Sequence, residues 1–231
     1  YMLESEGVPS EAMHRPPSTK TLIAPPECSE DELDKRLSGI RWRLDHASFG
    51  TLRNLDTEVP RLVEALRTTT AWLVWGESHD LPFIALFRRH AMFEAFSCAL
   101  RTDICPESLK IQVLQSIAVL ITQLKCRDSI TYLLSVLNPF FEIPPRLDNE
   151  EVAAYFVTLL KSLAIRLDAE NVQYCLTAPD GTLASEIGFD TGAQLHMPLL
   201  TFAVGLVTHR EMMVNTAARV AVLTVLQMEH P

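Results

Sequence analysis

The sequence lacks the features that mark membrane-spanning, secreted or nucleic-acid-binding chains. Its most apolar segments, residues 111–124 and 214–226, are interrupted by polar side chains and fall short of the ~20 residues that a membrane span needs. The N-terminus lacks the basic-then-apolar order of a signal peptide. Basic residues gather only at positions 88–90 and the net charge is -9, so nucleic acid is not an expected partner. We therefore expect a cytoplasmic protein whose association with membranes is at most peripheral.

Cysteine and histidine lack the spacing that metal or redox chemistry requires. The 5 cysteines include no CxxC pair, and the 7 histidines never occur at H-x-x-x-H spacing. Neither a zinc site nor a redox dithiol is therefore indicated. Buried, reduced thiols are the expected state of the cysteines. The sequence predicts no metal site and no cofactor.

Two short segments resemble catalytic motifs, but each lacks an essential part. Residues 76–80 have Asp80 where the nucleophile elbow G-x-S-x-G has its second glycine, and both flanks have helical spacing. Residues 189–192 contain one copy of the aspartic-protease triplet, which works only as a pair of carboxylates. We interpret Ser78 or Asp80 as the N-cap of a helix, and the second segment as a turn. The sequence therefore predicts no catalytic residue and no enzyme.

Strand signals are missing as well, because the chain contains neither strictly alternating segments nor Asn-Gly hairpins. Apolar residues instead recur at helical spacing almost to the end of the chain, and 48% of all residues are hydrophobic. Proline and glycine divide this pattern into roughly ten helices, which favours an all-α fold, an α-solenoid of the armadillo/HEAT type. The helices expected after residue 55 are 56–76, 80–87, 92–100, 106–124, 128–137, 148–163, 172–176, 195–207 and 211–228.

The N-terminal part differs in composition from the rest. Residues 1–28 are rich in Pro, Ser, Glu and Thr, and they predict a disordered leader. Ser29 and Glu32 form a capping box that begins a helical extension over residues 29–55. We expect the helical domain, residues 56–231, to continue beyond this segment, because the chain begins without Met and stops just after a strong helix.

Two further features interrupt the helical domain. Asp148 and Glu151 form a second capping box, after the prolines that end the expected helix 128–137. Residues 177–194 contain one proline and three glycines, and they predict a long loop. Helical repeats are therefore expected on both sides of an irregular connection.

Five short motifs follow one another along the chain. They lie at residues 75–96 (Trp-Gly, then Asp and a series of Phe), 111–115 (IQVLQ), 132–135 (YLLS), 150–163 (EEV and AY, then LLKSL) and 213–219 (MV, then AR). Their order and intervals resemble those of the FPL domain, which marks the Ema family of endosomal and autophagic trafficking proteins. The resemblance covers about residues 59 to 231, and the chain is identified as a divergent member of this family. Asn215 stands where the family has its first Arg of the last motif.

The resemblance implies a non-enzymatic scaffold or adaptor in endolysosomal membrane trafficking and autophagy. It implies partners among other proteins of the endosomal and autophagy machinery, and a cytoplasmic location peripheral to endosomal or Golgi membranes. A compact helical domain with a structural or oligomerisation role is the first alternative. A helical enzyme or small-molecule-binding protein is the second, and an enclosed polar pocket with titratable groups would favour it.

The matching motifs contain two groups of candidate positions. Polar side chains that the apolar stripes do not require are expected to form a protein-binding face. These candidates are Gln112, Gln115, Lys161 and Arg219. The second group is expected to support the fold, with Trp75 packed between helices and Gly76 ending one of them. It consists of Trp75, Gly76, Asp80, Phe87, Phe93 and Tyr155.

Overall fold

The computed structural model is entirely helical in the part of the chain that it describes. The described residues are 28–46, 55–144, 147, 149–187 and 194–228. They form ten α-helices and one 3-10 helix, with two isolated β-bridges and no strand. The predicted leader, apart from Cys28, and the segment 189–192 lie outside these residues.

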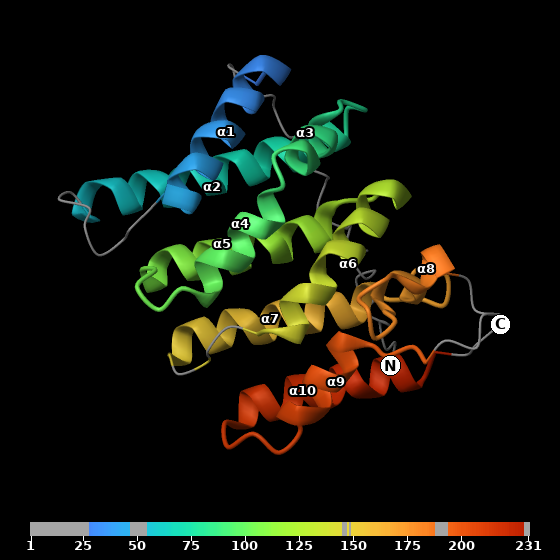
Figure 1. Cartoon of the computed structure of the whole chain (residues 1–231). Helices are drawn as coiled ribbons and strands as arrows, with labels where there is room; N and C mark the ends of the chain where they lie inside the picture. Colours follow the sequence, from blue (N-terminus) through green and yellow to red (C-terminus); the bar gives the residue numbers. More distant parts are fainter. Residues whose placement is uncertain (1–27, 47–54, 145–146, 148, 188–193, 229–231) are drawn as a thin grey trace, which may run out of the picture.

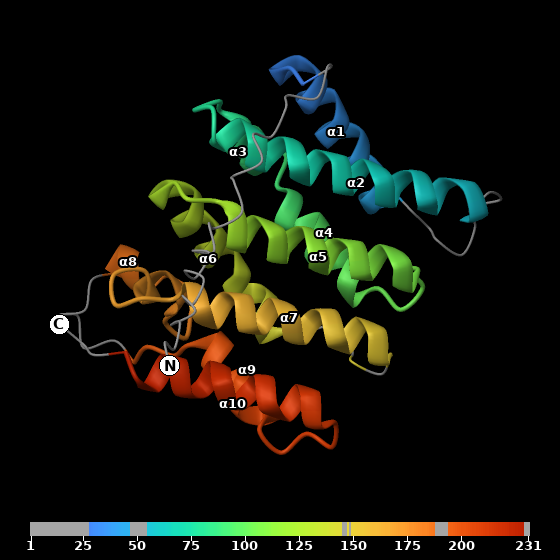
Figure 2. The ribbon, with the colours of Figure 1, turned by 180° about the vertical axis from the view of Figure 1, so that it is seen from behind.

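The helices form two layers, and those of the first layer lie side by side and run in the same direction (Figures 1 and 2). This layer contains α2 (Leu55–Glu77), α5 (Glu107–Gln123), α7 (Glu150–Arg166) and α10 (Met212–Leu226). The second layer contains α1 (Glu30–His46), α4 (Met92–Arg101), α6 (Arg127–Glu142) and α9 (Pro198–Leu206). Three short elements connect the layers, namely α3 (Phe83–Arg89), the 3-10 helix η1 (Val172–Cys175) and α8 (Ala184–Ile187). The predicted all-α helical-repeat fold is confirmed.

The core lies between the layers, and α5 is its central helix. This helix packs closely on α2 on one side and on α7 on the other. Its apolar residues occur at almost every turn, so more than one face is buried, as the wide apolar stripe predicts. Leu109, Val113, Leu114, Ile117 and Leu120 have no exposed surface. Burying each such side chain contributes about 1.5–3 kcal/mol before the entropy of ordering is counted.

Helix α1 contributes to the same core as the repeats. Leu33, Leu37 and Ile40 are buried against its neighbours. The Ser29 hydroxyl accepts a hydrogen bond from the backbone N–H of Glu32 at 3.3 Å, which is one half of the predicted capping box. The Glu32 carboxylate contacts Arg36 at 3.1 Å in place of the other half.

Prolines lie inside two of the helices. Pro60 is in the second turn of α2, which begins at Leu55. Helix α6 continues through Pro139 to Glu142, where proline was expected to break it. The carbonyl oxygen of Pro139 accepts hydrogen bonds from the Arg101 guanidinium at 2.7 Å and from the backbone N–H of Ile143 at 3.4 Å, which ties this last turn to α4. Tertiary contacts therefore override the local preference.

The start of α7 is displaced by one residue from the predicted box. Asn149 is the N-cap, and its side chain accepts from the backbone N–H of Val152 at 3.0 Å. Asp148 lies outside the described residues. The predicted loop 177–194 includes the short helix α8 and two bridges, in which Thr177 pairs with Leu183 and with His196.

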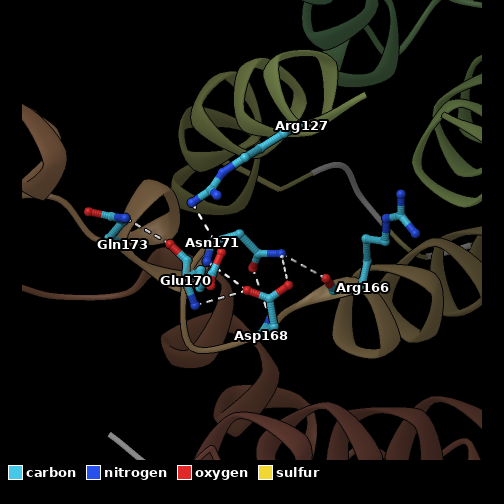
Figure 3. A network of polar contacts seen from close by, with 6 residues as sticks. All are labelled: Arg127, Arg166, Asp168, Glu170, Asn171 and Gln173. Atoms are coloured by element: carbon cyan, nitrogen blue, oxygen red, sulfur yellow. Dashed lines mark hydrogen bonds and ion pairs between the residues drawn. The ribbon is translucent and has the colours of Figure 1, made fainter. Parts of the chain in front are cut away.

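A polar turn ends α7 and connects it to α6 (Figure 3). The Asp168 carboxylate accepts from the backbone N–H groups of Glu170 and Asn171 at 2.9 and 2.8 Å. The Asn171 side chain accepts from the backbone N–H of Asp168 at 2.9 Å and donates to the carbonyl oxygen of Arg166 at 3.0 Å. Glu170 pairs with Arg127 at the start of α6 over 3.1 Å. This turn fixes where the chain leaves the first layer.

Polar contacts also join neighbouring helices at the edge where α2, α5 and α7 end. The Glu77 carboxylate accepts from the backbone N–H groups of Lys125 at 2.7 Å and Cys126 at 3.2 Å. The Arg166 guanidinium donates to the carbonyl oxygen of Leu124. The connection between α5 and α6 is thus held from α2 and from α7, which keeps the three parallel helices in register.

Candidate functional site

The phenylalanines of the first matching motif form part of the core. Phe87, Phe93 and Phe96 are at most 5% exposed, and their rings pack edge to face with centroids 5.5–6.0 Å apart. Gly76 lies against Phe83, since a Cβ at this position would be 2.2 Å from the Phe83 ring. The glycine is thus required by a close approach between α2 and α3, and α2 itself ends one residue later.

The two tryptophans of α2 have different surroundings. Trp72 is 2% exposed, and the Arg36 guanidinium of α1 lies 4.4 Å from its ring centre. Trp75 is partly buried against the core, stacks on the His79 ring with centroids 4.2 Å apart, and lies 6.4 Å from the Phe83 ring of α3. Trp75 thus packs where α2 meets α3, as expected, but Trp72 is the more deeply buried of the two.

The expectation that Ser78 or Asp80 caps α3 is wrong. Pro82 is the N-cap of α3, and no side chain bonds to the first turn of this helix. Asp80 has a φ of 56°, in the left-handed region that aspartate tolerates better than most residues. The Ser78 hydroxyl donates to the carbonyl oxygen of Trp75 at 2.7 Å. Both residues thus belong to the turn that follows α2.

A groove with a volume of about 520 Å³ crosses three helices of the first layer. It runs along α5 and is bordered by α2 and α7, so residues far apart in the sequence line it together. Its apolar part consists of Ala71, Leu114, Ala118, Val119 and the half-buried ring of Tyr155. The polar lining residues are Arg67, Thr70, Gln112, Gln115, Ser116, Thr122, Thr158 and Ser162.

Four of the hydroxyl groups of the groove share one hydrogen-bonding pattern. In each of these four the hydroxyl donates its proton to the backbone carbonyl oxygen four residues earlier in the same helix, at 2.8–3.0 Å. The residues with this pattern are Thr70, Thr122, Thr158 and Ser162. Because the proton is used within the helix, the oxygen lone pairs are what each hydroxyl offers to the groove.

Two of the predicted protein-binding residues, Gln112 and Gln115, line this groove. Gln112 is 8% exposed, and its Nε2 donates to the Ser116 hydroxyl at 3.3 Å. Among the described residues, neither Gln112 Oε1 nor the Gln115 carboxamide has a hydrogen-bond partner. Tyr155, expected to be a structural residue, lies at the same groove. The two glutamines come from one motif and Tyr155 from another, and the parallel packing of α5 and α7 brings them together.

The groove contains few charged groups. Arg67 is the one charged residue that lines it, and its guanidinium is paired with Glu64 one turn earlier in α2. Within the described part of the chain, no group of three or more His, Cys, Asp or Glu side chains is arranged to hold a metal ion. The arrangement provides hydrogen-bond acceptors and apolar contacts, and it lacks paired titratable groups for acid–base chemistry.

The other two predicted protein-binding residues lie elsewhere. Lys161 is half-buried on α7, next to the groove but not among its lining residues. Arg219 is exposed on α10, and its position in an apolar helix is explained by the outward face that it occupies. Two of the four residues predicted to bind proteins thus line the groove, and two do not. The sequence reasoning missed the hydroxyl groups, although Thr158 and Ser162 are one helical turn apart.

The cysteines are only partly as expected. All five are free, and Cys105 and Cys175 are buried, whereas Cys98 and Cys126 are exposed. Burial raises the pKa of the Cys105 and Cys175 thiols to about 12, so these two groups remain protonated and unreactive at neutral pH.

No helix in the described ranges combines the length and the apolar character that crossing a bilayer requires.

Known families and proteins resemble this chain over most of its length. The family FPL, described as an uncharacterised conserved protein, matches residues 66–226, which include every residue that lines the groove. Protein TRANSPARENT TESTA 9 of Arabidopsis thaliana is 25% identical over 202 residues, which are 82% of this chain and 23% of that protein.

Animal proteins are similar to about the same degree. Protein CLEC16A of Homo sapiens is 28% identical over 166 residues, or 71% of this chain and 14% of its own length. Protein CLEC16A homolog of Drosophila melanogaster is 27% identical over 173 residues, or 74% and 15%. The chain thus spans between 14% and 23% of the length of these relatives. No solved structure matches it.

Proposed function

Because the chain belongs to the FPL family, we propose that it acts as a non-enzymatic scaffold that binds proteins in endolysosomal trafficking and autophagy. The motifs resemble those of the Ema family, and the CLEC16A proteins are similar to this chain over 71–74% of its length. The proposed location is cytoplasmic, at the surface of endosomal or Golgi membranes. The proposed partners are other proteins of the endosomal and autophagy machinery.

The observation that carries this proposal is the open groove across α2, α5 and α7. Three parallel helices present one continuous surface, which is the geometry by which helical repeats bind other proteins. Its lining combines apolar side chains with hydroxyl and amide groups and provides no pair of carboxylates or histidines. Such a surface suits binding better than catalysis, and we therefore favour a scaffold over a helical enzyme.

The proposal can be tested by proximity labelling in cultured cells, with the whole chain fused to a biotin ligase. We expect the labelled proteins to be enriched in endosomal and autophagy components relative to the free ligase. Two variants provide a matched comparison, Thr158→Arg in the groove and Thr216→Arg on the exposed side of α10. A labelled set that is indistinguishable from that of the free ligase would contradict the proposal.

A further inference from the structure

We infer that the groove formed by α2, α5 and α7 binds an uncharged segment of a partner protein in extended conformation, by accepting hydrogen bonds from its backbone N–H groups. This inference rests on the proposed scaffold function and specifies the kind of partner segment. It depends on the hydrogen-bonding capacity of the lining residues, on their spacing and on their charge.

The groove is lined mainly by acceptors that are not yet used. Thr70, Thr122, Thr158 and Ser162 have donated their protons to their own helices, so their oxygens can only accept from a ligand. Gln112 Oε1 is a further acceptor on a side chain that is more than nine-tenths buried. A complementary ligand must therefore bring several N–H or O–H donors, since acceptors that lose water without a partner cost free energy.

The charges of the lining residues disfavour a ligand with cationic side chains. No carboxylate lines the groove, so a lysine or arginine side chain would lose hydration without gaining an opposite charge. An acidic ligand would meet a row of oxygen lone pairs and a single guanidinium, Arg67, that is already paired with Glu64. Neutral donors are favoured, and the commonest neutral donor in proteins is the peptide N–H.

The length of the groove suits a short extended chain. On α5 the lining extends from Gln112 to Thr122, which at ~1.5 Å per residue corresponds to about 15 Å. An extended peptide covers this length with roughly five residues, and its N–H groups on one edge recur about every 6.7 Å, so two or three of them can face the groove. A helical ligand would already use its N–H groups internally, and an alkyl chain has none.

The apolar residues of the groove explain how side chains of such a segment would be held. Ala71, Ala118 and Val119 leave shallow space between the helices, and the Tyr155 ring forms one wall. In an extended segment alternate side chains point the same way, so every second residue can pack against these apolar positions. The preferred segment therefore has small or apolar residues at alternate positions and no charge.

The experiment is a selection of random peptides displayed on phage against the whole chain, after depletion on the Thr158→Arg variant. Thr158 is exposed in the middle of α7, so arginine fills the groove without entering the core. The control is Thr216→Arg, since Thr216 is likewise an exposed threonine on a helix of the first layer, α10. We expect selected peptides to be uncharged, to bind the control like the unmodified chain, and to lose at least about tenfold in affinity on Thr158→Arg.

A second measurement tests recognition of the backbone. N-methylation of alternate amides in a selected peptide should weaken binding about fivefold or more for each amide that donates to the groove, whereas methylation of the intervening amides should not. Gln115→Leu, which keeps the size of the side chain and removes its amide, should weaken binding by a similar factor. Circular dichroism melting of each variant confirms that the fold is retained.

Several outcomes would overturn the inference. Selected peptides with helical apolar spacing, or with runs of acidic or basic residues, would show that another chemistry is recognised. If no selected peptide bound the unmodified chain better than the Thr158→Arg variant, the groove would not be a peptide-binding site. In that case, binding of phosphatidylcholine vesicles that is lost on Thr158→Arg would assign the groove to lipid. If peptide selection fails while proximity labelling still finds endosomal proteins, the scaffold proposal stands and uses another surface.

Discussion

The α3–α4 region and the groove differ in a way that separates the residues that identify the family from the proposed binding site. Residues 83–96 are rich in phenylalanine and match a recognisable motif, and all of their phenylalanine side chains are buried. The groove is lined largely by Thr, Ser, Gln and Ala, which carry no obvious signature in the sequence. The most recognisable residues of this chain thus stabilise its fold, whereas the residues available to a partner are chemically ordinary. Substitutions in the two regions should therefore have opposite effects on stability and on binding.

The largest expected effect is on the core side of this comparison. Trp72→Ala should lower the free energy of unfolding by about 3–5 kcal/mol, because it removes a fully buried aromatic ring from between the layers. Trp75→Ala should cost less, since its ring is only partly buried. Urea unfolding of both variants measures the difference. An equal or larger loss for Trp75→Ala would mean that the motif tryptophan is the core residue after all.

The second effect concerns Gly76. Gly76→Ala should destabilise the fold by about 1–3 kcal/mol, because the new Cβ would overlap the Phe83 ring. Gly39→Ala is the matched control: it lies inside α1, and no atom would come within 4 Å of its Cβ. This control should stabilise by about 0.5–1 kcal/mol through the higher helix propensity of alanine. Thermal melts of both variants should therefore shift in opposite directions.

A smaller effect distinguishes a turn from a cap at Asp80. Serine is a good N-cap but a poor residue in the left-handed region, so Asp80→Ser should cost about 1 kcal/mol in the turn and nothing in a cap. Ala91, with a φ of 47°, provides the converse test. Ala91→Gly should stabilise by about 1 kcal/mol, because glycine has no Cβ to strain this conformation. Chemical denaturation of both variants resolves these shifts, and an unaffected Asp80→Ser would restore the capping role.

The smallest expected effect on stability is on the groove side. Thr158→Arg should change the free energy of unfolding by no more than about 0.5 kcal/mol, because the side chain is exposed and arginine is a good helix former. Binding of a selected peptide should nevertheless be lost. If stability and binding fell together, the groove would be part of the structural core, and the contrast between the two regions would not hold.

Much of the fold could be predicted because the spacing of apolar residues in the sequence identifies the helices. Most helix boundaries fall within a few residues of the prediction, and those that depend on tertiary contacts do not. Pro139 remains helical where α4 supplies Arg101 to its carbonyl oxygen, a contact that no local pattern contains. The position of Asn149 as a cap was missed for a simpler reason, since Asp148 next to it has the same preference.

The candidate site was less predictable, because it depends on which helices become neighbours. Gln112 and Gln115 were selected as polar residues in an apolar helix, and this reasoning led to the groove. The same reasoning selected Arg219, which lies on the outer face of α10. The sequence shows that a residue is polar and helical, but only packing decides whether it faces a groove or bulk water. The hydroxyl groups lacked any signal beyond their spacing.

The parallel direction of α2, α5, α7 and α10 has an electrostatic consequence. Each helix carries a partial positive charge at its N-terminus, roughly half an elementary charge, and parallel stacking places these like poles along one edge. Glutamates occupy the first turns of α5 and α7 and the N-cap of α10, where they offset the repulsion; they are Glu107, Glu150, Glu151 and Glu211. Acidic residues that are scattered along the sequence are thus gathered by the fold onto one side.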